Sequence, residues 1–324
     1  MMKKTKIKSL TMSIMMGMMI SFNCTSNAQV VESATIVPEA SSPVVFQTEI
    51  QQPTNQETKA FKAPSFVNWH KGPSADIEAI GVGFPPVNSG QRGMMLARRA
   101  AMVDAYRVLA ETIQGVQIDS ETTMKDLAIA DDSVSAKVSA LIKGAYIIEE
   151  GTNDDGSYYM KMCIPMFGKE KSVAAVAIPS LYKNTPPTPL PKVTETTLPK
   201  PEIKELQKVN YTGVVIDADN MGLEATFAPV IFDTNGRIVY GIENLDKNKA
   251  ISDGMVSYAN ELQNATNGTR AGDNPLVIKA KTIKSGKNSV NPVNVVISVE
   301  DADRILLANK NTQILNNACV VFVK

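Results

Sequence analysis

Residues that carry out nucleophilic, redox or metal chemistry are scarce in this chain. Its 324 residues include one histidine, one tryptophan and three cysteines. A catalytic arrangement that needs an imidazole would have to use His70, which follows Trp69 in SFVNWHKGPS. We interpret His70 as a surface or turn residue, because no cysteine of the chain lies in a nucleophile-like context.

The cysteines are too few and too far apart for a metal or redox pair. Cys163 and Cys319 lie in the apolar runs MKMCIPM and NNACVVFV. Such surroundings are typical of buried free thiols. A disulfide between them is the alternative in an oxidising compartment, and the sequence does not place the two sulfur atoms. We predict neither a bound metal nor a cofactor.

Phosphate- and calcium-binding motifs are incomplete. Gly81-Val82-Gly83 lacks a third glycine and runs into two prolines, which excludes a dinucleotide site. The stretch from Asp217 to Gly222 is similar to the start of a calcium loop. However, Met221 and Ala228 stand where the fifth and twelfth positions need oxygen ligands. We expect a strand-end turn there, and we predict that the protein is not an enzyme.

Positive charge is concentrated at the start of the chain. Four lysines lie among the first eight residues, and an apolar run from Leu10 to about Phe22 follows. This pattern is typical of an export signal and is too short for a comfortable transmembrane helix. The other 29 basic and 33 acidic residues make a mildly acidic protein, which has no field to attract nucleic acid.

Two processing routes fit this signal. Ser26-Asn27-Ala28 has the small-x-small pattern, so cleavage after Ala28 would release a soluble exported protein that begins at Gln29. Lipidation of Cys24 is the alternative, although Ser21-Phe22-Asn23 departs from a lipobox. We favour a signal peptide of residues 1–28, so membrane association would follow only from lipidation of Cys24.

Stretches rich in proline and threonine divide the rest of the chain. Residues 29–63 have little periodicity and predict a flexible tether. Residues 183–209 include TPPTPLPKVTETTLPKPEIK, whose prolines favour an extended conformation and predict a linker. Two α+β domains remain, at residues 64–182 and 210–324.

The first domain is predicted to have the order βαβαββ, with helices layered on an antiparallel or mixed sheet. Its last two strands flank Asn153-Asp154-Asp155-Gly156, a strong hairpin signal. The alanines of the first helix would allow a close approach to the sheet, and Gly115 would end this helix as a left-handed residue. The predicted elements are Ile77–Phe84, Gln91–Gln114, Val116–Thr123, Ser133–Lys143, Ala145–Glu150 and Tyr158–Pro165.

The second domain is predicted to be a mixed-sheet α+β domain. It begins with the strand YTGVVIDA, and its hairpin surrounds Asp233-Thr234-Asn235-Gly236. Helices are expected at Lys249–Leu262 and Asp301–Leu315. The other expected strands are Thr226–Phe232, Arg237–Tyr240, Leu276–Ile283, Val293–Val299 and Cys319–Val323.

The helix at Gln91–Gln114 carries the candidate interaction surface. Adjacent Arg98 and Arg99 are an interface candidate for an acidic partner. A solvated face is the alternative, because Arg107 has the spacing to pair with Asp104 and Glu111. A basic stripe with stacking aromatics, which nucleic acid needs, is absent. The apolar stripe of this helix is predicted to comprise Met95, Met102, Tyr106, Leu109 and Ile113.

Five motifs stand out between Pro64 and Phe167: FVNWHKG, EAIGVGF, LARRAAMVDAYRVLAETIQGVQIDSETT, VSALIKGAYIIEE and DGSYYMKMCIPM. In this order they resemble the Lpp-twenty lipoprotein domain. The core of the resemblance comprises Ala97, Arg98, Ala101, Asp104, Ala105, Arg107, Leu109 and Ala110. The resemblance implies a non-catalytic domain of envelope lipoproteins and of flagellar proteins that form rings or discs at the outer membrane.

Together these features predict a non-catalytic, exported cell-envelope protein of the periplasm or outer membrane. We expect it to act in assembly, through protein partners or self-association, with a flagellar role implied by the resemblance alone. The alternative is a periplasmic binding module for a small ligand or glycan, with its pocket between the two domains.

Overall fold

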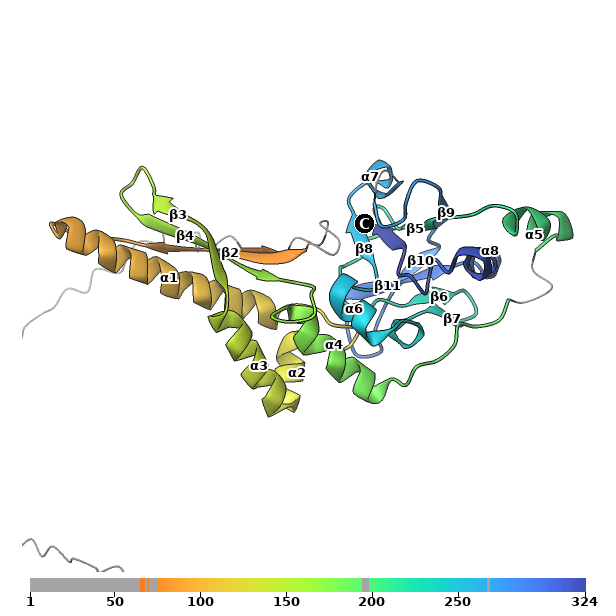
Figure 1. Cartoon of the computed structure of the whole chain (residues 1–324), viewed down its shortest axis with the longest axis horizontal. Helices are drawn as coiled ribbons and strands as arrows, with labels where there is room; N and C mark the ends of the chain where they lie inside the picture. The colour runs from red at the N-terminus through yellow and green to blue at the C-terminus, as the bar shows by residue number, and fades with distance from the viewer. Residues whose placement is uncertain (1–64, 68, 70–74, 194–197, 267–268) are drawn as a thin grey trace, which may run out of the picture. The chain divides into compact units, whose positions relative to one another are not determined.

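A computed structural model describes residues 65–67, 69, 75–193, 198–266 and 269–324, which all fall in one compact unit. The predicted signal peptide and tether, with Cys24 and Ala28, lie outside these residues, as does His70. The described chain is an α+β protein (Figure 1). We call residues 65–184 its N-terminal half and residues 213–324 its C-terminal half.

A four-stranded antiparallel sheet forms the base of the N-terminal half. Its strands are β1 (Ser65–Val67), β2 (Asp76–Gly83), β3 (Tyr146–Thr152) and β4 (Tyr158–Pro165), in the spatial order β1-β2-β4-β3. The predicted hairpin between β3 and β4 is confirmed. Gly156 has a φ of 80°, and the N–H of Asn153 donates to the carbonyl of Ser157 at 2.8 Å.

Helix α1 (Gly90–Gln114) lies along this sheet with its small residues inward (Figure 1). Its buried face comprises Gly93, Ala97, Ala101, Ala105, Val108, Leu109 and Ile113. The predicted close approach of the alanines is confirmed for the three that are buried. The predicted apolar stripe is wrong at Met95, which is 65% exposed. The alanines, rather than this methionine, face the sheet.

Glycines of β2 make this approach possible. A Cβ atom at Gly81 would overlap the Ala101 carbonyl oxygen and would lie 2.8 Å from the Cα of Ala105. A Cβ at Gly83 would lie 2.7 Å from the backbone nitrogen of Ala101. The helix also hydrogen-bonds to the strand, since the Asp104 carboxylate accepts from the N–H of Val82 at 3.1 Å. Glycine in a strand interior often marks such a close backbone approach.

The predicted strand at Val116–Thr123 is wrong. The chain turns back on itself there, and a single antiparallel bridge joins Gln117 to Thr123. Gly115 is also not left-handed, because its φ is −79°. Instead, backbone carbonyls of this turn accept hydrogen bonds from the C-terminal half: the N–H of Ala228 donates to the Ile118 carbonyl at 2.9 Å.

Three further helices belong to the N-terminal half. Helix α3 (Asp132–Lys143) confirms the predicted second helix. Helix α2 (Met124–Ala130) was not predicted and begins with a capping box between Thr123 and Asp126. Helix α4 (Val173–Asn184) was not predicted either; the Ser172 side chain caps its start by accepting from the N–H of Ala175.

Two sheets make up the C-terminal half. One is parallel, with β8 (Ser257–Ala259), β12 (Val320–Val323), β5 (Gly213–Asp217) and β9 (Pro275–Lys279) in that order. The other is mixed, with β10 (Thr282–Ser285), β11 (Pro292–Ile297), β6 (Ile231–Asp233) and β7 (Ile238–Tyr240). The predicted hairpin between β6 and β7 is confirmed, and Gly236 has a φ of 83°.

Some expected elements of this half are divided. The expected helix at Lys249–Leu262 is wrong beyond its first turn: α6 (Lys247–Asp253) ends at Gly254, whose φ is 74°, and β8 and α7 (Leu262–Thr266) follow. The expected strand Leu276–Ile283 forms β9 and β10, which belong to different sheets. Helix α8 (Val299–Thr312) confirms the expected final helix, and a 3-10 turn, η2 (Ile242–Asn244), follows β7.

The described part of the predicted linker lies against the C-terminal half. The N–H of Thr188 donates to the Glu243 carbonyl at 2.9 Å, and Arg237 donates to the Lys192 carbonyl at 2.9 Å. An unpredicted helix, α5 (Lys200–Leu206), follows. Leu198 and Leu206 are buried in a cluster with Leu307 of α8. Burial of these leucines holds the segment in place, and we call residues 185–193 and 198–209 the strap.

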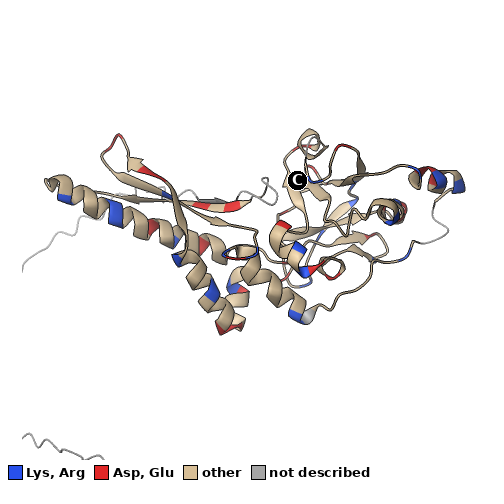
Figure 2. Cartoon of the chain, viewed as in Figure 1, with Lys and Arg blue, Asp and Glu red and all other residues tan. Residues whose placement is uncertain are grey.

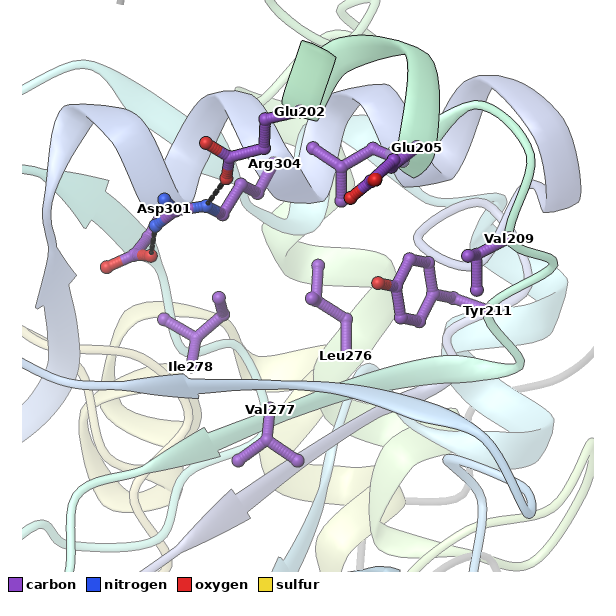
Figure 3. A pocket seen from close by; sticks show the side chains of 10 residues that line it. Glu202, Glu205, Val209, Tyr211, Leu276, Val277, Ile278, Asp301 and Arg304 are labelled. Atoms are coloured by element: carbon purple, nitrogen blue, oxygen red, sulfur yellow. Dashed lines mark hydrogen bonds and ion pairs between the residues drawn. The ribbon is translucent and has the colours of Figure 1, made fainter. Parts of the chain in front are cut away.

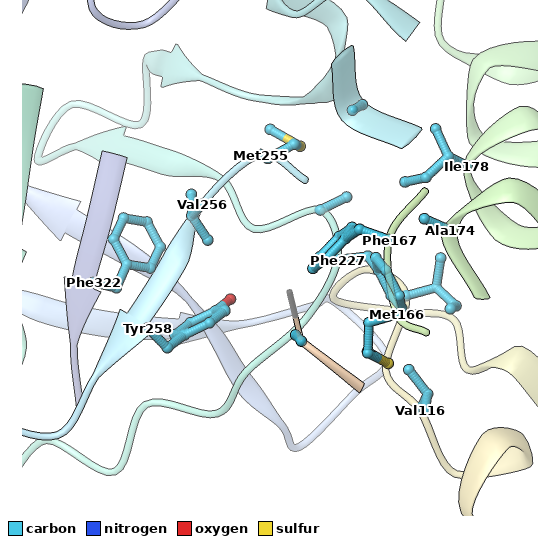
Figure 4. Packing of buried hydrophobic residues seen from close by; sticks show 14 of the residues in the cluster. Val116, Met166, Phe167, Ala174, Ile178, Phe227, Met255, Val256, Tyr258 and Phe322 are labelled. Atoms are coloured by element: carbon cyan, nitrogen blue, oxygen red, sulfur yellow. The ribbon is translucent and has the colours of Figure 1, made fainter. Parts of the chain in front are cut away.

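Aromatic rings join the two halves. Trp69 lies edge-on to Phe227 and Tyr258, with ring centroids 5.2 and 5.7 Å apart. Phe167 of the N-terminal half also meets Phe227 at 5.2 Å (Figure 4). Edge-to-face pairs at such distances are favourable beyond the area that they bury. The halves therefore share a packed core, in which the Trp69 ring meets those of Phe167, Phe227 and Tyr258.

We predict that Gly81→Ala strongly destabilises the protein, by about 3 kcal/mol in the free energy of unfolding, because its methyl group would overlap the backbone of α1. Chemical denaturation measures the loss. Gly115→Ala is the matched control: Gly115 has an ordinary helical φ, and an added Cβ would lie 3.6 Å from its nearest neighbours. Equal stability of the two variants would contradict the close-approach explanation.

Candidate functional site

One face of α1 combines exposed apolar side chains with positive charge. We define the α1 outer face as Arg92, Met95, Leu96, Arg99 and Val103. Their spacing places them on one side of the helix, opposite the alanines that meet the sheet. Val103 is 68% and Leu96 is 45% exposed. Contiguous apolar side chains of this kind, bordered by charge, mark interaction surfaces more often than isolated ones do.

The two arginines proposed as an interface have different environments. Arg98 makes two hydrogen bonds to the Glu150 carboxylate of β3, from Nε at 2.8 Å and from Nη2 at 3.0 Å. This pair ties α1 to the edge strand of the sheet, and the guanidinium lowers the pKa of Glu150. Arg99 is exposed, and within the described residues it has no ion-pair partner. Arg99 is therefore the better interface candidate. Figure 2 shows basic and acidic residues interspersed along α1.

The predicted pairing of Arg107 is confirmed. Its guanidinium lies 2.8 Å from Asp104 and 2.7 Å from Glu111. These charges on the second half of α1 are therefore compensated locally. Among the described residues, the arginines of α1 without an ion-pair partner are Arg92 and Arg99, both on the α1 outer face.

The edge of the sheet beside α1 also exposes apolar side chains. Tyr146, Ile147 and Ile148 of β3 are all exposed, and β3 is an outer strand of its sheet. Exposed edge strands offer unpaired backbone groups to a partner. The register of β3 shifts between Ile147 and Glu149, an irregularity that disfavours extended pairing with a flat strand.

The two described cysteines are free thiols, as the apolar runs suggested. Cys163 is buried and lies 3.3 Å from the Tyr146 hydroxyl, a contact that raises the pKa of Tyr146 to about 12. Cys319 is half-buried, and this burial raises the pKa of its thiol. The raised pKa of Cys319 favours its unreactive protonated thiol.

The stretch after β5 is the strand-end turn that its sequence predicts. The Asp217 carboxylate accepts from the N–H of Asp219 at 3.1 Å, and Gly222 has a φ of 79°. Asp219 accepts a hydrogen bond from the Asn220 amide at 2.7 Å. Within the described residues, no three histidine, cysteine or carboxylate side chains converge as a metal site would need.

A pocket of about 440 Å³ lies between α5, α8 and β9, and we call it the α5 pocket (Figure 3). Carboxylates of Glu202, Glu205 and Asp301 lie around it together with Arg304. The Arg304 guanidinium donates from Nε to Glu202 at 2.7 Å and from Nη1 to Asp301 at 2.6 Å. Its other lining residues are Leu206, Val209, Tyr211, Leu276, Val277 and Ile278.

Sequence reasoning missed this pocket because α5 lies in the predicted linker. The available signal was Pro201 followed by Glu202, since proline and acidic residues favour the first turn of a helix. Every lining residue comes from α5, β9, α8 or the residues between α5 and β5. The pocket thus lies in a different place from the predicted pocket between the domains.

Within the described residues, no helix has both the length and the apolar character needed to cross a bilayer. Residues 213–324 match a family described as Treponema pallidum Tp0624, second domain. The match runs from the start of β5 through β12, which is less than half of the chain. The C-terminal half is therefore similar to that domain. No curated protein matches the chain.

We predict that Arg98→Glu lowers stability slightly at neutral pH, because two carboxylates would then face each other between α1 and β3. The double variant Arg98→Glu/Glu150→Arg should recover part of the loss, because it restores opposite charges. Thermal unfolding measures all three proteins. Arg99→Glu is the control and should leave the unfolding midpoint unchanged, because no described residue pairs with Arg99.

The Arg98–Glu150 pair makes the stability of the protein depend on pH, and the sign of this dependence follows from the pKa of Glu150. Its contribution is present at neutral pH and is lost as the pH falls through the lowered pKa of Glu150, because the folded state binds this proton less well than the unfolded chain does. Glu150→Gln should therefore reduce the acid destabilisation. An unchanged pH profile would contradict this role of the pair.

Proposed function

We propose that this protein is a non-catalytic cell-envelope protein that acts in assembly, and that it binds a protein partner or a second copy through the α1 outer face. The observation that carries the proposal is the exposure of Met95, Leu96 and Val103 beside Arg99, which has no ion-pair partner within the part of the chain that the structure describes. Large apolar side chains that stay exposed together on one side of a helix are suited to packing against another chain.

The position of this face on α1 supports a role in binding rather than in folding. The α1–sheet contact uses the opposite side of the helix, so the outer face can be covered without disturbing the core. Apolar side chains with an arginine among them are also the composition favoured at the centre of protein interfaces. The resemblance of this segment to the Lpp-twenty domain agrees with assembly at the outer membrane.

The proposed compartment is the periplasm or the outer membrane, and the support for it is the lysine-rich, apolar start of the chain. We predict that the protein purified from its native host begins at Gln29. Mass spectrometry of the mature N-terminus checks this. A diacylglyceryl adduct on Cys24 would show lipid anchoring instead, and an intact N-terminus would contradict export.

The assembly proposal predicts position-specific crosslinking in intact cells. A photo-crosslinking amino acid at Val103 or Met95 should yield one or a few defined adducts, because those side chains would lie in an interface. Val290 is the matched control, since it is 90% exposed on the other half of the protein. Comparable crosslinking from Val290, or none from α1, would overturn the proposal.

Arg99→Glu should lower the yield of the α1 adducts severalfold without a change in thermal unfolding. A repeat with purified protein distinguishes the two kinds of partner, because a second copy gives the adduct without other proteins. In that case sedimentation should show an association that weakens in the variant.

A binding module for a small ligand is the second candidate function. The specific observation in its favour is the α5 pocket, whose volume lies within the range of small-molecule sites. Its polar groups converge from two helices above an apolar floor, an arrangement that such sites share.

A further inference from the structure

We propose that the α5 pocket binds a ligand that carries an alkylammonium group, with the ammonium at Glu205 and the alkyl chain on the apolar floor. The proposal rests on the second candidate function and names its class of ligand. It is independent of the α1 outer face, which belongs to the other half of the chain.

The floor of the pocket is apolar and preformed. Leu276 and Ile278 of β9 point into the pocket, whereas Val277 points away from it, as alternation along a strand requires (Figure 3). Leu206 of α5 adds a buried apolar side chain from above. These three side chains are already buried, so an aliphatic chain bound here would remove mainly its own apolar surface from water, which favours binding.

The charges around the pocket are unbalanced. Three carboxylates lie around it with a single guanidinium, and Arg304 is already shared by Glu202 and Asp301. Glu205 is exposed on the same helix, and within the described residues it has no ion-pair partner. The pocket therefore offers an acceptor for one additional cation and repels an anion.

Nearby lysines do not supply that cation. Lys279 alternates with Ile278 along β9, so it belongs to the opposite face of the strand. Lys200 of α5 lines a different pocket, beside Leu190 and Lys310. Lys204 and Lys208 flank Glu205 in sequence, but among the described residues neither makes an ion pair with it, so its carboxylate can accept a cation from a ligand.

Tyr211 adds an aromatic ring and a hydroxyl group to the carboxylates of the pocket. Its ring forms one side of the pocket, and its hydroxyl points toward the interior (Figure 3). The face of a phenol ring attracts an ammonium group, and its hydroxyl can accept a hydrogen bond from one. Carboxylate, aromatic ring and apolar floor together fit an alkylammonium better than a neutral alcohol or a carboxylate.

The experiment uses the full-length mature protein and three matched probes: hexylamine, hexanol and hexanoate. Binding is followed by NMR shifts of the backbone amides around Leu276 and Tyr211. We expect hexylamine to give saturable shifts. Hexanol should bind with an affinity at least about fivefold lower, because it lacks the charge that pairs with Glu205. Hexanoate should give no shifts. Nα-acetyl-lysinamide forms a fourth arm, which distinguishes a lysine side chain from a free amine as the source of the group.

Variants then test the assigned contacts. Glu205→Gln keeps the shape of the side chain and removes its charge, so hexylamine affinity should fall about fivefold or more. Tyr211→Leu should also weaken binding. Glu261→Gln, at an exposed glutamate outside the pocket, is the matched control and should bind as the parent does.

Three results would overturn the inference. If hexanol or hexanoate binds as tightly as hexylamine, the pocket binds ligands but not this class, and the second candidate function survives. If Glu205→Gln binds hexylamine as the parent does, the ammonium is not held at Glu205. If no probe binds saturably, the inference fails together with the support that the pocket gives to the second candidate function.

Discussion

The contact between α1 and β2 is the constraint on which the N-terminal half depends. Gly81 and Gly83 lack side chains at the points where the backbone of α1 comes closest. Three buried alanines complete the contact from the helix side, and Asp104 accepts a hydrogen bond from Val82 within it. Because the backbones approach so closely, small residues are required on both surfaces, and a larger side chain on either would separate helix and sheet.

The opposite face of α1 has a different composition. The inner face uses alanines where β2 comes closest and larger residues, Val108, Leu109 and Ile113, further along the helix. Met95 and Val103 lie on the other side and are exposed. The chemistry of this surface is simple: apolar contact area with the guanidinium groups of Arg92 and Arg99, neither of which has an ion-pair partner among the described residues. This composition suits recognition of another protein.

In the C-terminal half, the strap and helices α5 and α8 pack together beside the parallel sheet. The strap brings α5 against α8 because Leu198 and Leu206 are buried with Leu307. The same placement positions Glu202 to pair with Arg304 and leaves Glu205 open beside Tyr211. A segment with the composition of a linker thus builds one wall of a pocket. The shared aromatic core around Phe227 fixes the half that carries this pocket to the half that carries the α1 outer face.

The sequence alone determined the features that depend on local chemistry. The two hairpins follow from glycines with positive φ at Gly156 and Gly236, and α3 and α8 follow from helical periodicity. Tertiary contacts decided the rest. Residues 116–123 alternate like a strand, yet they form a turn whose carbonyls bond to the other half. Arg98 and Arg99 are neighbours in sequence, but only the position of β3 shows that Arg98 pairs with Glu150, whereas Arg99 has no ion-pair partner among the described residues. The α5 pocket joins residues about a hundred positions apart, and no local pattern encodes such a meeting because it arises from the burial of distant leucines.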